Sequence, residues 1–189
     1  VDLDIDVSIA EGRIADLLDV VDVSTPSIDG EVTGSVTLRG NPSALTGDVV
    51  LDLSRMALLG ERFPTGRFVG WMDEGRFTVD DLSLSRWSGD EGVVIRGTID
   101  DGWKTNIDVA ATGLRLGRLD AFAAAKIPIR GMMYIDGRIG GTLFAPEPHG
   151  RVAFRDTWYA GKAVQDSTLF FETAGERLQL QGHLLGKGL

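Results

Sequence analysis

The stretch VDLDIDVSI, residues 1–9, decides the fold class of this chain. Its aspartates alternate with aliphatic residues, so it is either a ladder of metal-binding carboxylates or a strand with one dry and one wet face. A calcium loop needs glycine at its sixth position and a bidentate glutamate at its twelfth. Counted from Asp2, these positions hold Val7 and Arg13. The metal interpretation therefore fails, and the strict alternation predicts a strand with one buried face.

Composition narrows the class of protein. The 189 residues include 28 acidic and 19 basic side chains, and the formal net charge of −9 argues against nucleic acid or anionic headgroups as partners. The absence of cysteine excludes thiol catalysis, disulfides and thiolate metal sites. No window approaches the roughly 18–20 apolar residues of a membrane-spanning helix, and no signal peptide stands at the start. We expect a segment of a longer protein, with any anchor outside it.

Alternating runs recur along the whole chain and predict an all-β fold. Each run is bounded by glycine, Asn-Pro, Asp-Gly or an acidic pair, which are typical of turns. Helical spacing appears at 13–21 and more weakly at 118–127, which predicts one or two short helical turns. The predicted strands, besides the opening one, cover residues 31–40, 47–56, 75–86, 92–100, 104–116, 132–143, 150–156, 167–173 and 177–184.

The two halves of the chain resemble each other. Gly12-Arg13-Ile14 and Gly117-Arg118-Leu119 each precede an apolar turn, a proline and an Ile-x-Gly triplet, at offsets of 101 to 105 residues. A second internal similarity aligns residues 81–99 with residues 166–184 without a gap. We therefore expect a single segment, 1–189, that holds roughly two stacked repeat units, about 12–116 and 117–189, with the second truncated.

Apolar residues recur at i and i+2 within the strands, with Thr, Asp, Arg or Ser mostly between them. Residues two apart lie on one side of a strand, so one face of the sheet should be dry and the other wet. About ten strands spaced ~4.8 Å apart would give a dry face about 45–50 Å long. Alternation alone leaves open whether this face closes as a sandwich core or holds acyl chains. The residues predicted to line it are Val36, Leu38, Val49, Leu51, Leu53, Phe77, Val79, Leu84, Ile95, Ile107, Val109, Ile139, Val152, Phe154, Leu169, Leu178 and Leu180.

The sequence offers no catalytic motif, so we expect a protein that is not an enzyme and holds no cofactor or metal. His149 and His183 lack metal-ligand spacing and are predicted to lie in turns or on the wet face. There is no G-x-S-x-G elbow and no phosphate loop. The tryptophans lie near predicted strand ends, where we expect them to plug the ends of the dry face. They are Trp71, Trp87, Trp103 and Trp158.

The repeat resembles a known family. Its layout of Gly-Arg-Leu, a short apolar turn, Ile-x-Gly and then the leucine and proline between Gly137 and Gly150 is similar to that of TamB-type proteins. These are the inner-membrane-anchored component of the translocation and assembly module. The ladder Leu-x-Leu-x-Gly-x-Leu at 178–184 is a pattern also met in AsmA-like relatives.

The resemblance implies a long, twisted strand-repeat sheet curled into a taco-like groove with an apolar interior, in the periplasm of a Gram-negative bacterium. The groove would conduct phospholipid acyl chains between the inner and outer membranes. With a TamA-like outer-membrane β-barrel partner, it would support the assembly of outer-membrane proteins and autotransporters. Val1, Leu3, Ile5 and Val7 would face the groove. The alternative is a closed β-repeat scaffold or chaperone that pairs with client strands by β-augmentation and carries no lipid.

Overall fold

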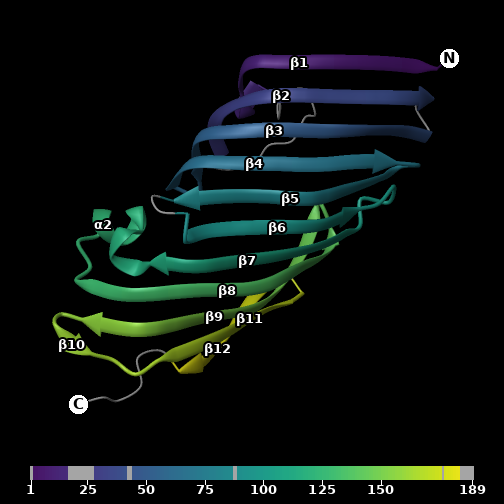
Figure 1. Ribbon diagram of the computed structural model, residues 1–189. Coiled ribbons are helices and arrows are strands. Elements are labelled where there is room, and N and C mark those ends of the chain that lie inside the picture. The colour runs from purple at the N-terminus through teal and green to yellow at the C-terminus, as the bar shows by residue number, and fades with distance from the viewer. Residues whose placement is uncertain (1, 17–27, 42–43, 87–88, 176, 184–189) are drawn as a thin grey trace.

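A single antiparallel sheet accounts for most of the chain. The computed structural model describes residues 2–16, 28–41, 44–86, 89–175 and 177–183. They form a 12-stranded sheet in the order β1-β2-β3-β4-β5-β6-β7-β8-β9-β11-β12, with β10 beside β9 (Figure 1). Almost every strand pairs with the next one along the chain, so the sheet is an open meander. The prediction of an all-β fold is confirmed.

The elements have the following bounds. The strands are β1 (Leu3–Arg13), β2 (Ile28–Asn41), β3 (Ala44–Leu58), β4 (Glu61–Asp73), β5 (Arg76–Arg86), β6 (Glu91–Ile99), β7 (Thr105–Arg115), β8 (Ile129–Thr142), β9 (Ala145–Tyr159), β10 (Lys162–Ala163), β11 (Ser167–Ala174) and β12 (Arg177–His183). A 3-10 turn, η1 (Leu116–Arg118), and helix α2 (Asp120–Ala124) join β7 to β8, and residues 14–16 are helical after β1. The rest of the first predicted helical turn, residues 17–21, lies outside the described residues, as do Val1 and Trp87.

Every predicted strand is present, but the prediction missed β4 and the short β10. In β4, Gly66 and Gly70 stand where alternation requires a large apolar residue, and Pro64 interrupts the run. Neighbouring side chains fill the space instead. The rings of Phe68 and Phe77 stack with centroids 6.1 Å apart, and both lie within 3.1 Å of where a Cβ on Gly70 would be. The apolar face is therefore continuous in space where the sequence pattern is broken.

Two small clusters form the buried core, and each lies against a helical segment. The first cluster consists of Val32, Leu53, Met56, Phe63 and Leu84, and Ile14 packs on it. The second consists of Ala111, Leu114, Leu116 and Leu119, and Phe122 of α2 packs on it.

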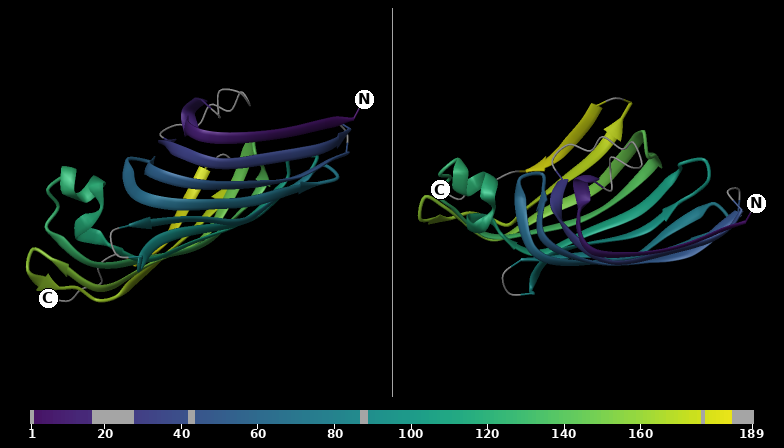
Figure 2. Two further views of the ribbon diagram at one scale, coloured as in Figure 1. Left: turned by 45° about the horizontal axis from the view of Figure 1, so that its top comes forward. Right: turned by 90° about the horizontal axis from the view of Figure 1, so that it is seen from above.

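The remaining sheet is open. Figure 2 shows a twisted, curved sheet with α2 standing at one end of the strands. The solvent-accessible surface is 12248 Å² for a chain of 20.3 kDa. A compact monomer of this mass exposes about 8,800 Å². The excess follows from a sheet that has not folded onto itself as a sandwich.

The order of elements is compatible with the predicted two units, whose division remains a prediction. The series β1, helical residues 14–16, β2 and β3 is followed later by the series β7, η1 with α2, β8 and β9. The two series differ in the strand that follows each of them. β4 spans thirteen residues, whereas β10 has two, so that β9 pairs directly with β11.

Candidate functional site

The candidate site is one face of the sheet, which the cross-strand register defines. Directly opposite residues of antiparallel strands lie on the same face. From Leu53 in β3, such partners lead without a break to both edges of the sheet. This first row consists of Gly12, Val32, Leu53, Gly66, Leu84, Val93, Ala111, Ile135, Val152, Leu169 and Gly182.

Two more rows run beside the first, and neither contains a charged residue. The second row consists of Ile9, Gly34, Leu51, Phe68, Leu82, Ile95, Val109, Gly137, Gly150, Phe171 and Leu180. The third consists of Val7, Val36, Val49, Gly70, Val79, Gly97, Ile107, Ile139 and Pro148. We call the surface that these three rows form the apolar face.

The register places every residue predicted to line the dry face on the apolar face. Most belong to the three rows. Leu38 and Phe77 belong to a shorter row beside the third, Phe154 lies two residues from Val152, and Leu178 lies two residues from Leu180. Their burial varies with position.

Exposure on the apolar face is greatest at its two edge strands, and Val7 of β1 is 43% exposed. Leu53, Val79 and Leu84 are buried, with at most 8% of their surface exposed. Leu178 and Leu180 of β12 are 58% and 65% exposed, and the other predicted residues are half-buried. The face is thus covered over parts of its central strands and more exposed at β1 and β12.

Sequence reasoning missed Phe171, which completes the second row. Its ring lies against two glycines, since a Cβ on Gly137 would be 3.1 Å from the ring and a Cβ on Gly150 2.9 Å. Phe170 and Phe171 are adjacent, so their types alone do not show which one faces the apolar side. The paired glycines opposite them are the signal that identifies Phe171.

A buried charge cluster holds α2 at one rim of the apolar face. Arg86, only 2% exposed, donates hydrogen bonds to the Glu61 carboxylate at 2.8 Å and to the Arg118 carbonyl at 3.0 Å. The Glu61 carboxylate also accepts from the backbone N–H groups of Asp120 and Ala121, at 2.8 and 3.0 Å. The start of α2 is therefore fixed by a side chain of β4, three strands away from β7.

A second buried acid, Glu91, completes the cluster. It is 1% exposed and accepts from the backbone N–H of Arg115 at 3.3 Å, and the Arg115 and Arg118 guanidinium groups lie 3.1 and 3.5 Å from it. At the outer side, Arg62 lies 2.7 Å from Asp120. The hydrogen bond from Arg62 is the main cause that lowers the pKa of the Asp120 carboxyl below its usual value. The charges at this rim are paired with one another beneath and beside α2.

The opposite face, which we call the polar face, carries cross-strand ion pairs. Distances of 2.7 to 2.8 Å join Arg96 to Asp81, Arg138 to Asp108 and Arg151 to Asp136. The hydrogen bond to Asp108 raises the pKa of the Arg138 guanidinium. Such exposed pairs contribute little to stability, but they hold long side chains in defined positions.

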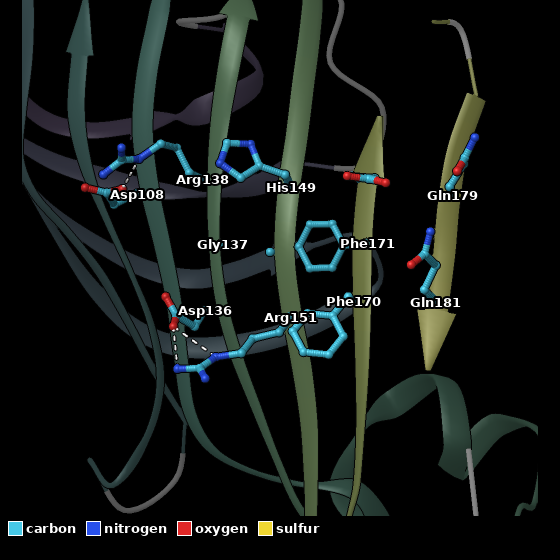
Figure 3. Close-up of a pocket in the computed structure, with 12 residues that line it drawn as sticks. Asp108, Asp136, Gly137, Arg138, His149, Arg151, Phe170, Phe171, Gln179 and Gln181 are labelled. Carbon is cyan, nitrogen blue, oxygen red and sulfur yellow. Dashed lines mark hydrogen bonds and ion pairs between the residues drawn. The ribbon is translucent and has the colours of Figure 1, made fainter. Parts of the chain in front are cut away.

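A depression of about 570 Å³ lies on the polar face over β7, β8, β9, β11 and β12 (Figure 3). Two of the ion pairs line it, together with His149, which lies on the wet face as predicted. Phe170, Glu172, Gln179 and Gln181 line its other side. Gly137, Gly150 and Phe171 of the second row also border the depression, but its charged and amide side chains lie on the polar face, so it is not the predicted acyl-chain site.

Trp71 and Trp103 do not plug the ends of the apolar face, so the prediction is wrong for these two, and Trp158 is 49% exposed. Trp71 is 39% exposed and lies on the polar face, opposite Asp48 and Thr78. Trp103, in the turn before β7, is 54% exposed and packs edge-to-face on Phe144 with ring centroids 5.8 Å apart. These rings decorate the outside of the sheet and its turns.

Within the described ranges, no three or more His, Cys, Asp or Glu side chains are placed to hold a metal ion. No helix in the same ranges has the length and hydropathy needed to cross a bilayer. Comparison of the chain with protein-family models, with curated proteins and with solved structures found no match in any of the three.

Proposed function

We propose that the apolar face lines a groove that conducts phospholipid acyl chains between membranes. The observation that carries this proposal is the continuity of the apolar rows. The first and second rows cross all eleven strands of the main path, from β1 to β12, and contain only apolar residues and glycine. At a spacing of ~4.8 Å per strand, they form a lane about 48 Å long.

The uniformity of the lane supports movement along it. Burial of each methylene group is favourable by about 0.8 kcal/mol, so an acyl chain gains free energy by lying on the face. Several residues of the first row are buried in the core clusters, whereas every residue of the second row is at least partly exposed. Because no charged or hydrogen-bonding side chain interrupts the second row, neighbouring positions along it offer an acyl chain similar free energies. A chain can then slide from strand to strand without crossing a polar barrier. The open side lets the headgroup stay in water.

The cellular setting belongs to the same proposal. The chain would be a periplasmic segment of a TamB-type protein anchored in the inner membrane, and the sheet would curl into a taco-like groove. Outer-membrane proteins and a TamA-like β-barrel would be its protein partners. The exposed Asp4 and Asp6 of β1 suit the water-facing side of such a groove.

The test is native mass spectrometry with lipid extraction, on protein purified without added lipid. Leu51→Arg and Val109→Arg place a charge in the second row. Val50→Arg and Ala110→Arg are matched controls, because these neighbours lie on the polar face. We expect bound phospholipid in wild type and both controls and its loss in both row variants, at equal urea-unfolding midpoints. Lipid-free wild type, or row variants that keep their lipid, would contradict the proposal.

A second candidate function, strand pairing with client proteins, is favoured by the open edges. In the part of the chain that the structure describes, β1 and β12 each pair on one side only. Strand addition to β12 would use backbone hydrogen bonds and the exposed Leu178 and Leu180. A lipid-free protein that binds an outer-membrane strand peptide, and loses it when the peptide backbone is N-methylated, would support this candidate over the conduit.

A further inference from the structure

Two aromatic rings on the polar face have no role in the groove. Tyr134 is 40% exposed and Phe170 is 56% exposed. Tyr134 lies opposite Ala153, and Phe170 lies opposite Arg151 and Gln181. Both therefore point to the water-facing side, among charged and amide side chains. Exposing an apolar ring to water is unfavourable, and exposed aromatic side chains are enriched where proteins bind partners.

The two rings belong to adjacent depressions that share one ion pair. Phe170 lines the depression of about 570 Å³, and Tyr134 lines a neighbouring one of about 250 Å³. Asp136 and Arg151, 2.8 Å apart, line both. Figure 3 shows this pair beside the Phe170 ring, with Gln181 on the next strand. An extended ligand lying across both depressions would pass over the ion pair.

The register gives the separation of the two residues along the sheet. Tyr134 and Phe170 lie two strands apart, because Ala153 of β9 lies opposite both Tyr134 and Thr168. Phe170 is two residues further along β11 than Thr168. Two strand spacings and two residues along a strand place the Cα atoms about 12 Å apart. A chain of a few linked sugar rings is long enough to span that separation.

The polar groups suit a neutral ligand rich in hydroxyls. Most of the charged side chains in the larger depression are bound in the Asp108–Arg138 and Asp136–Arg151 pairs, so the surface has no strong excess of either sign. The paired guanidinium groups offer donors in defined planes, and the exposed amides of Gln179 and Gln181 add further donors and acceptors. Vicinal hydroxyls of a sugar match such planar groups, and the C–H face of a pyranose stacks on an aromatic ring.

We propose that the polar face over β8, β9, β11 and β12 binds a neutral oligosaccharide chain. Phe170 and Tyr134 stack on sugar rings, and the Asp136–Arg151 pair between them binds hydroxyl groups. This site is on the side of the sheet opposite the acyl-chain groove, so it does not depend on the proposed function. Occupation of one face leaves the other free.

The test is titration of the protein, followed by NMR chemical shifts, with cellotetraose and with tetra-N-acetylchitotetraose as probes. We expect saturable binding of at least one probe, weakened at least tenfold by Phe170→Ala and by Tyr134→Ala. Val50→Ala is the matched control, an apolar residue on the polar face outside both depressions, and should bind as wild type. All three residues are exposed, and equal unfolding midpoints would confirm intact folding.

A second pair of variants separates stacking from general hydrophobicity. Phe170→Trp keeps a flat ring and should retain binding, whereas Phe170→Leu keeps apolar surface and should lose it. The proposal is overturned if neither probe gives saturable shifts up to about 10 mM, or if Phe170→Leu binds as well as wild type.

Discussion

The charge cluster beneath α2 makes a quantitative prediction, because two arginines contact the same carboxylate in different surroundings. Arg86 and Arg62 both contact Asp120, at 3.4 and 2.7 Å. The Arg86 side chain is 2% exposed and that of Arg62 is 74% exposed. We expect Arg86→Met to destabilise the fold strongly and Arg62→Met to have a much smaller effect, although Arg62 makes the shorter contact, because the Arg62–Asp120 pair is exposed to water.

The magnitude follows from what each arginine leaves behind. Removing one partner of a buried ion pair costs about 3–5 kcal/mol, because the remaining charge is left uncompensated. For Arg86 that charge is Glu61, and the cation over the Phe63 ring, 5.6 Å from its centroid, is lost as well. Among the described residues the buried Nε of Arg86 has no hydrogen-bond partner, so removing it relieves the cost of burying an unsatisfied donor. We therefore expect the lower end, about 3 kcal/mol, which corresponds to a fall in Tm of about 6–12 °C for a chain of this length.

Urea unfolding followed by circular dichroism measures the effect. The midpoint of Arg86→Met should fall while the m value is unchanged, since the fold and its exposed surface stay the same. Arg62→Met serves as the matched control. Equal midpoints for the two variants, or an Arg86→Met midpoint equal to wild type, would refute the reasoning that the buried cluster fixes α2 on the sheet.

Three further predictions concern single residues. The folded-state pKa of the Asp120 carboxyl is lowered, so the contribution of Asp120 to stability is present above the unfolded-state pKa of about 3.8 and is lost as the pH falls through the folded-state pKa. The urea midpoints of wild type and Asp120→Asn should therefore converge as the pH is lowered from about 5 to about 2.5. Gly70→Ala should cost about 1–3 kcal/mol in urea unfolding, because the new Cβ presses on two stacked rings, and Gly102→Ala should be within about 0.5 kcal/mol of wild type. Leu116→Ala, at a fully buried site, should lower the free energy of unfolding by about 2–5 kcal/mol, as thermal melts would show.

The sequence was sufficient to predict the apolar face because its alternation keeps one phase. Each predicted lining residue was assigned from spacing within its own strand, and the register then brought all of them to one side. The prediction failed in β4, where Gly66 and Gly70 hide the alternation. There the apolar surface comes from aromatic rings two residues away or on the next strand, which a single-strand pattern does not reveal.

The charge cluster and the polar-face depressions were beyond sequence reasoning for a different reason. Arg86 lies 25 residues from Glu61 and 34 from Asp120, and these residues meet only because β4, β5 and the β7–β8 connection converge at one rim. Tyr134 and Phe170 are likewise neighbours only through β9. Such juxtapositions depend on register across several strands, whereas sequence patterns report on one strand at a time.

The chemistry of the apolar face favours an acyl chain over a polypeptide as its occupant. A peptide laid across the rows would bring backbone N–H and C=O groups, which need hydrogen-bond partners once they leave water. The first two rows offer only hydrocarbon side chains and glycine. The charged residues Arg86 and Glu91, at the rim under α2, are already paired with Glu61, Arg115 and Arg118. An acyl chain brings no polar group to the surface that it covers, so it can occupy the lane without leaving a donor or acceptor unsatisfied. A client strand is accommodated better at the edge of β12, which pairs only with β11 among the described residues.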